Sequence, residues 1–183
     1  MYNSGQRPEF ITTLLEKEPK GGITVSIYES AIQMERDGEQ FYRDLARNAP
    51  NKGFEAIFNL LADDEAEHQK VIARLQADSP VGAIAANQAG PNLFAQLKKD
   101  RSLNDLDSSQ LELYQKALAV EKKSQELYLA EAGQTAKPEA KQVFEQLAAQ
   151  EEQHYFLIHN IVELMLHPQT WVENGEFYHI EEY

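Results

Sequence analysis

Two short motifs in the chain combine a glutamate with a histidine three residues later. They are Glu65-Ala-Glu-His68 and Glu151-Glu-Gln-His154. Three residues are close to one helical turn, so both side chains of each motif project from the same side of a helix. Carboxylate and imidazole are ligands for divalent transition metals, and each motif could therefore give one metal ion two donors. A lone motif of this kind is usually solvated, so support is needed from elsewhere in the sequence.

An internal repeat supplies that support. When the chain is compared with itself at an offset of 86, residues 31–75 face residues 117–161 without a gap, and ten positions are identical. Both Glu-x-x-His motifs are among the matched positions. So are a further glutamate and a tyrosine in each half, namely Glu35, Tyr42, Glu121 and Tyr128. Two halves of the chain therefore carry the same chemical groups.

The elements that position these groups follow from the spacing of apolar residues. In four segments these recur every three or four residues, which is the period of an α-helix. Ser26 and Glu29 form a capping-box pattern at the first segment, and Pro138 suits the first turn of the last. The four helices are expected at about 26–48, 54–75, 107–133 and 138–167. The chain is therefore predicted to be all-α, with two helical hairpins.

The connection between the hairpins is long. The segment of about 77–106 has no sustained period, although Leu93 to Lys99 could form a short helix. A crossover of this length is typical of the ferritin-like four-helix bundle. At 183 residues the chain has the size of one domain. We therefore expect a single domain over 1–183, with the bundle at about 26–167 and an extended tail at 168–183.

Six ionisable residues lie on the helix faces that should form the apolar core. They are Glu35, Glu65, His68, Glu121, Glu151 and His154. Burying a carboxylate costs several kcal/mol, and four in one core would also repel one another. Two divalent cations balance the charge of four carboxylates, and neutral imidazoles complete the coordination. The sequence thus predicts a site for two metal ions, which could be iron, zinc or manganese.

Other residues near these six have open roles. Tyr42 and Tyr128 could be ordinary core aromatics, or could donate a hydrogen bond to a ligating carboxylate or to bound oxygen. Gly38 and Ser124 are small and occupy equivalent positions in the repeat, so they could leave space for a small ligand beside the metals. Glu176-Phe-Tyr-His179 has no repeat partner and is expected at the surface.

Composition excludes several classes of protein. With 17 Lys and Arg against 30 Asp and Glu, the net charge of −13 disfavours nucleic acids and anionic membranes as partners. The absence of cysteine excludes disulfides, thiolate nucleophiles and Cys-ligated iron. No stretch is long and apolar enough to span a membrane, and the first residues do not resemble a secretory signal. A cytoplasmic protein is expected.

At the six ionisable residues and the two tyrosines described above, the chain resembles the diiron domain of rubrerythrins, in the ferritin-like superfamily. The resemblance covers about residues 26–167. The resemblance implies two iron ions, with Glu65 and Glu151 bridging them, Glu35 and Glu121 as terminal ligands, and His68 and His154 completing the coordination. Rubrerythrins proper carry a further glutamate where this chain has Ser124, and a Cys-ligated iron site that a chain without cysteine lacks. Electrons would therefore come from a separate donor.

The expected function is a diiron oxidoreductase that reacts with hydrogen peroxide or dioxygen. An alternative is iron oxidation, storage or handling without peroxidase turnover, and a third is a redox-silent binding protein whose site holds zinc. The resemblance also makes a homodimer plausible. The sequence leaves the native metal, the oxidant and the reductant open.

Overall fold

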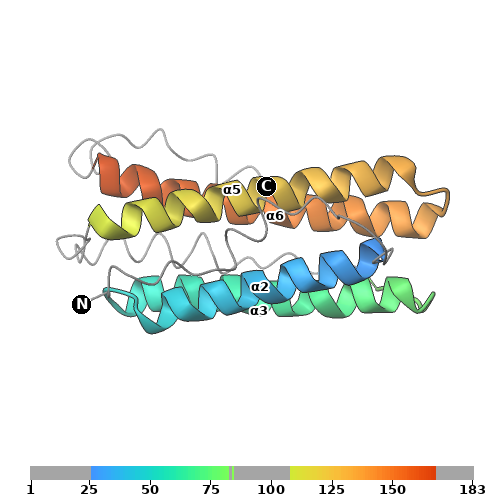
Figure 1. Ribbon diagram of the computed structural model, residues 1–183, viewed down its shortest axis with the longest axis horizontal. Helices are drawn as coiled ribbons and strands as arrows, with labels where there is room; N and C mark the ends of the chain where they lie inside the picture. The colour runs from blue at the N-terminus through green and yellow to red at the C-terminus, as the bar shows by residue number, and fades with distance from the viewer. Residues whose placement is uncertain (1–25, 83, 85–107, 168–183) are drawn as a thin grey trace, which may run out of the picture.

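The computed structural model describes residues 26–82, 84 and 108–167, and four α-helices make up most of this part of the chain (Figure 1). They are α2 (Ile27–Arg47), α3 (Lys52–Gln76), α5 (Ser108–Gln134) and α6 (Pro138–Leu166). Within each hairpin α2 packs against α3 and α5 against α6, and α3 also contacts α6. The predicted all-α fold, a ferritin-like four-helix bundle, is confirmed.

Local sequence explains where the helices begin. The backbone N–H of Ser26 donates to Glu29 at 3.2 Å, as the capping-box pattern predicts. The Asn51 side chain accepts hydrogen bonds from the N–H groups of Gly53 and Phe54 at 3.0 and 3.2 Å, so α3 begins two residues earlier than the apolar pattern indicates. Pro138 is the first residue of α6, where its missing N–H costs no hydrogen bond.

The direction of the helices explains the long connection. Figure 1 shows that α3 and α5 run in the same direction, so that α3 ends and α5 begins at opposite ends of the bundle. A chain leaving Gln76 must therefore travel the length of the bundle before α5. The predicted short helix at Leu93–Lys99 and the predicted tail at 168–183 lie outside the described residues.

The apolar core is divided into two clusters. One is built around Phe54, Phe58 and Ile161, and the other around Ile72 and Leu147, all of them almost fully buried. The first cluster takes the end of α2, the start of α3, the start of α5 and the end of α6, while the second takes the opposite halves. Between the two clusters the middle of the bundle is therefore free for polar side chains. None of the described helices is long and apolar enough to cross a membrane.

Candidate metal centre

The middle of the bundle holds all six ionisable residues that the sequence places on the helix seams. Glu35 comes from α2, Glu121 from α5, and each of α3 and α6 contributes one Glu-x-x-His motif. Their exposed fractions are very small: Glu35 2%, Glu65 3%, His68 0%, Glu121 1%, Glu151 1% and His154 5%. The four helices therefore bring four carboxyl groups and two imidazoles together in a buried site.

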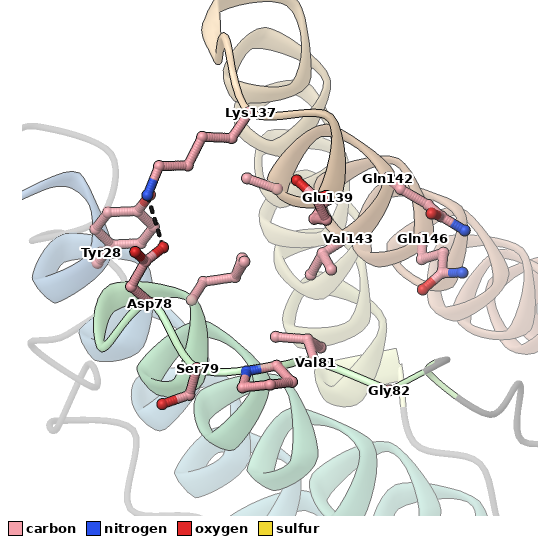
Figure 2. Close-up of a pocket in the computed structure, with 13 residues that line it drawn as sticks. Tyr28, Asp78, Ser79, Val81, Gly82, Lys137, Glu139, Gln142, Val143 and Gln146 are labelled. Carbon is pink, nitrogen blue, oxygen red and sulfur yellow. Dashed lines mark hydrogen bonds and ion pairs between the residues drawn. The ribbon is translucent and has the colours of Figure 1, made fainter.

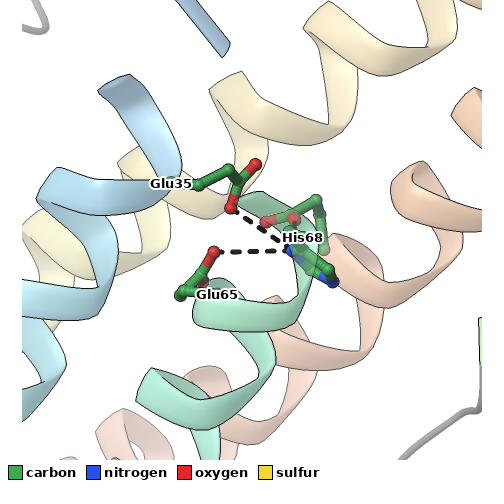
Figure 3. A group of neighbouring side chains, drawn as sticks. Glu35, Glu65 and His68 are labelled. Carbon is green, nitrogen blue, oxygen red and sulfur yellow. Dashed lines mark hydrogen bonds and ion pairs between the residues drawn. The ribbon is translucent and has the colours of Figure 1, made fainter. Parts of the chain in front are cut away.

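The first group consists of Glu35, Glu65, His68 and Glu151, whose ligand atoms all lie within 4.8 Å of one another. His68 Nδ1 lies 3.3 Å from Glu35 Oε2, 3.5 Å from Glu65 Oε2 and 2.9 Å from Glu151 Oε1. Figure 3 shows Glu35, from α2, and Glu65, from the same helix α3 as His68, both directed at the His68 ring. Three carboxylates and one imidazole nitrogen thus converge on a volume that a single cation could fill.

The second group consists of Glu65, Glu121, Glu151 and His154, again with all ligand atoms within 4.8 Å. His154 Nδ1 lies 3.3 Å from Glu65 Oε1, 3.5 Å from Glu121 Oε2 and 4.0 Å from Glu151 Oε2. Glu65 and Glu151 thus belong to both groups, and each turns one oxygen toward His68 and the other toward His154. Each of these two carboxylates could therefore give one oxygen to either of two cations.

Burial dominates the electrostatics of the terminal carboxyl groups. It raises the pKa of Glu35 well above its usual value, and the negative charges of Glu65 and Glu151 add to the effect. Burial also raises the pKa of Glu121 to about 8, although contact with His154 acts in the opposite direction. Without cations, both groups therefore favour the protonated form in the folded protein.

The histidines and Glu65 show the opposite balance. Burial disfavours charge on His68, but its contacts with Glu151 and Glu35 raise the pKa of the ring well above the usual value. The pKa of His154 is raised in the same way, against burial, by Asp64, Glu121 and Glu65. Burial alone would raise the pKa of Glu65, yet its contacts with Glu35 and both histidines lower it. In the metal-free site, bound protons therefore supply the positive charge, and metal ions would displace these protons.

Buried atoms without partners test whether two metals fit the site. Among the described residues, three atoms of the cluster form no hydrogen bond: Glu121 Oε2, Glu151 Oε1 and His154 Nδ1. Glu151 Oε1 is 2.9 Å from His68 Nδ1, but the two groups are not aligned for a hydrogen bond. Each of the three is a ligand atom facing the cluster, and leaving such an atom unsatisfied costs about 1–3 kcal/mol or more. The donor set therefore fits two divalent cations.

The two tyrosines connect the hairpins at this site. The Tyr42 hydroxyl, from α2, donates to Glu121 Oε1 on α5, and the Tyr128 hydroxyl, from α5, donates to Glu35 Oε1 on α2. Of the two roles left open by the sequence, the structure thus supports hydrogen bonding to a candidate ligand. Burial, followed by the charge of Glu121, raises the pKa of Tyr42, so its phenol keeps its proton. Each phenol contacts one oxygen of its partner carboxylate, and the second oxygen faces the ring of a candidate ligand histidine.

Replacement of Tyr42 by Phe is expected to lower the free energy of unfolding by about 1–3 kcal/mol, because one oxygen of the buried Glu121 carboxyl loses its donor. Tyr128→Phe should act equally through Glu35. Urea unfolding of the metal-free variants, followed by far-ultraviolet circular dichroism, measures the effect. Tyr155→Phe is the matched control, because this half-buried tyrosine stacks on His159 away from the cluster. An unchanged stability in both cluster variants would contradict the assigned hydrogen bonds.

Two residues that the sequence analysis missed contact the outer nitrogens of the histidines. Gln150 Oε1 lies 2.6 Å from His68 Nε2, and Asp64 Oδ2 lies 3.5 Å from His154 Nε2. Each residue directly precedes a shared glutamate, and the two are equivalent in the repeat. That equivalence was a usable signal. Because the two residues differ in type, a comparison of identical positions in the repeat does not detect them.

The small residues have close neighbours. A Cβ atom added to Gly38 would lie 3.4 Å from the carboxyl carbon of Glu65, and the Ser124 hydroxyl lies 3.4 Å from the Met34 sulfur. Gly38 therefore lies beside a candidate metal ligand and Ser124 beside Met34, and the space for an exogenous ligand at these two positions stays a prediction. The third motif, Glu176 to His179, lies outside the described residues.

A surface pocket lies away from this cluster, at the end of the bundle where α3 ends and α6 begins. It has a volume of about 480 Å³ and is lined by residues that include Tyr28, Asp78 and Gln146. Figure 2 shows the ion pair at its edge, in which Lys137 Nζ lies 2.6 Å from Asp78 Oδ1. The pocket shares no residue with the six of the cluster.

Two groups of buried donors that share two carboxylates, inside a ferritin-like bundle, are the arrangement of a carboxylate-bridged dimetal protein. Comparison with protein families identifies the member of this class: the Rubrerythrin family model matches residues 27–162. The chain belongs to the rubrerythrin family. No curated protein and no solved structure matches it.

Proposed function

We propose that this protein is a non-haem diiron oxidoreductase that reacts with hydrogen peroxide or dioxygen and takes its electrons from a separate donor. The observation that supports this most strongly is the placement of Glu65 and Glu151, whose two oxygens face different histidines. Two ferrous ions held by shared carboxylates can deliver two electrons to one small oxidant when each is oxidised to the ferric state, whereas one ferrous ion oxidised to that state supplies only one.

The residues of the chain have separate roles in this proposal. Glu35, Glu65, Glu121, Glu151, His68 and His154 hold the two iron ions, which supply the redox chemistry when bound. Tyr42 and Tyr128 orient the terminal carboxylates by donating to one oxygen of each. The apolar clusters on both sides limit access of water to the centre. Reduction of hydrogen peroxide to two water molecules consumes two electrons and two protons, so each turnover requires an external reductant.

The stoichiometry of iron oxidation tests the proposal. Protein loaded anaerobically with two ferrous ions per chain should be oxidised completely by one equivalent of hydrogen peroxide, because one peroxide accepts two electrons. Near-ultraviolet absorbance during a stepwise peroxide titration measures the end point, and rapid mixing with peroxide or dioxygen compares the oxidants. Protein loaded with zinc is the control, since zinc has no redox chemistry.

Three results would contradict the proposal in different ways. Ferrous protein that peroxide and dioxygen both leave unchanged would exclude the oxidoreductase. Loading with many more than two iron ions per chain would favour iron storage, the alternative expected from the sequence. Protein that is purified with zinc and does not bind iron would favour the third alternative, a redox-silent binding protein.

A further inference from the structure

The two histidines of the centre have the same orientation but different outer partners. Each ring turns Nδ1 toward the carboxylates and Nε2 toward a side chain of the other hairpin. His68, on α3, meets the amide oxygen of Gln150 on α6 at 2.6 Å. His154, on α6, meets the carboxylate of Asp64 on α3 at 3.5 Å. With Nδ1 directed at a metal, the ring proton of each histidine is on Nε2 and faces this outer partner, which favours one tautomer.

Asp64 and Gln150 occupy equivalent places in the internal repeat, since both directly precede a shared glutamate and they are 86 positions apart. The six candidate ligands are paired type for type across the same repeat. The partners of the histidines are not, because one is a carboxylate and the other an uncharged amide. The two groups of ligands are therefore equivalent in type, but the outer partners of their histidines differ by one negative charge.

A carboxylate partner makes an imidazole a stronger ligand. It polarises the outer N–H bond and so raises the electron density at the nitrogen that binds the metal. It also places an additional negative charge near the cation on that side. The amide of Gln150 orients His68 through the shorter contact but adds no charge. The group that contains His154 therefore has an electrostatic advantage over the group that contains His68.

We propose that the two metal positions are unequal, that the first cation binds at Glu65, Glu121, Glu151 and His154, and that Asp64 and Gln150 are the positioning residues that set this order. The inference rests on the metal centre in the proposed function, but not on its reaction with peroxide. Losing a partner of this kind typically weakens metal binding about ten- to hundredfold. A preference of that size is expected for the His154 position.

Titration of the metal-free protein with Co²⁺ tests the order of filling. Unlike ferrous iron, Co²⁺ bound by carboxylates and histidines is not readily oxidised by air. It also shifts the NMR resonances of the N–H protons on the histidines that coordinate it. Stepwise binding alone is not decisive, because repulsion between two cations also weakens the second step in a symmetric site. The decisive result is which histidine responds first. At one equivalent, the shifted N–H resonance should be the one that Asp64→Asn perturbs.

Three variants complete the test, with affinities measured by calorimetry. Asp64→Asn keeps an acceptor for His154 but removes the charge, and should weaken the first step about ten- to hundredfold. Gln150→Glu gives His68 a charged partner, and should strengthen the second step. The double variant should reverse the order in which the histidines respond. Asp63→Asn is the matched control, because this exposed neighbour removes the same charge from α3 but pairs with Arg43 instead.

The outcomes separate this inference from the proposed function. Simultaneous response of both histidines in the unsubstituted protein, or an unchanged order in the double variant, would overturn the inequality of the two positions. The same holds if Asp63→Asn weakens binding as much as Asp64→Asn, because the effect would then be one of general charge. Failure to bind Co²⁺ at all would instead remove the metal centre on which the proposed function depends.

Discussion

Replacement of Glu151 by Gln is expected to eliminate binding of both metal ions, whereas Glu35→Gln should eliminate only one. Glu151 turns Oε1 toward His68 and Oε2 toward His154, so each cation loses a charged donor when the carboxylate becomes an amide. Glu35 belongs to the first group alone. Elemental analysis after anaerobic loading with ferrous iron and desalting should give close to no iron for the first variant and about one ion per chain for the second.

The fold of the variant can be checked independently. Glu151→Gln has nearly the same volume as the natural residue, so the four helices should still form. In the metal-free protein the variant loses the charge that lies 2.9 Å from His68 Nδ1, so a lower midpoint at an unchanged helix content is expected. Far-ultraviolet circular dichroism and thermal unfolding measure this. Glu65→Gln is a second variant of the same kind. Retention of two iron ions by both variants would show that neither carboxylate bridges the metals.

Addition of metal to the metal-free protein should raise its midpoint of thermal unfolding by roughly 15–30 °C at neutral pH. A ligand at a thousand times its dissociation constant stabilises the folded state by about 4 kcal/mol, so two sites supply about 8 kcal/mol. In a chain of this size, each kcal/mol raises the midpoint by about 2–4 °C. Differential scanning calorimetry of protein prepared with a chelator, before and after addition of Zn²⁺, measures the difference.

The rise in the thermal midpoint that metal produces should be larger at higher pH, because the metal-free site holds protons that it loses as pH rises. Glu121, with a pKa raised to about 8, binds a proton more strongly in the folded chain than in the unfolded chain. The stability it contributes is therefore lost as pH rises from about 4.5 through 8. The raised pKa values of His68 and His154 act in the same direction above about 6.5.

The midpoint of the metal-free protein should therefore fall between about pH 6 and pH 9, while that of the metal-loaded protein changes less, because cations replace the protons. Glu65, with its lowered pKa, contributes in a different window, since its stabilisation is lost only as pH falls below about 4.5. A midpoint that rises with pH in the metal-free protein, or a metal effect of only a few degrees, would contradict this account.

Much of the fold follows from patterns that are local in the sequence. The period of the apolar residues places the four helices because a helix must bury one face, and Ser26 and Pro138 mark two of the starts. The apolar period predicts the start of α3 two residues late, because the cap of this helix depends on hydrogen bonds to the Asn51 side chain and not on an apolar residue. Helix ends depend on such individual hydrogen bonds, so they are less predictable than helix centres.

The sequence by itself determined which six ionisable residues face the core, because spacings of three and four residues fix the face of a helix and the internal repeat doubles the pattern. Only the tertiary structure decided how these groups meet. The partner of Tyr42 is 79 residues away, that of Tyr128 is 93 away, and Gln150 reaches His68 across 82 residues. Such contacts depend on how one hairpin packs against the other. This packing sets the rotation of each helix about its axis, which the spacing of residues within one helix does not determine.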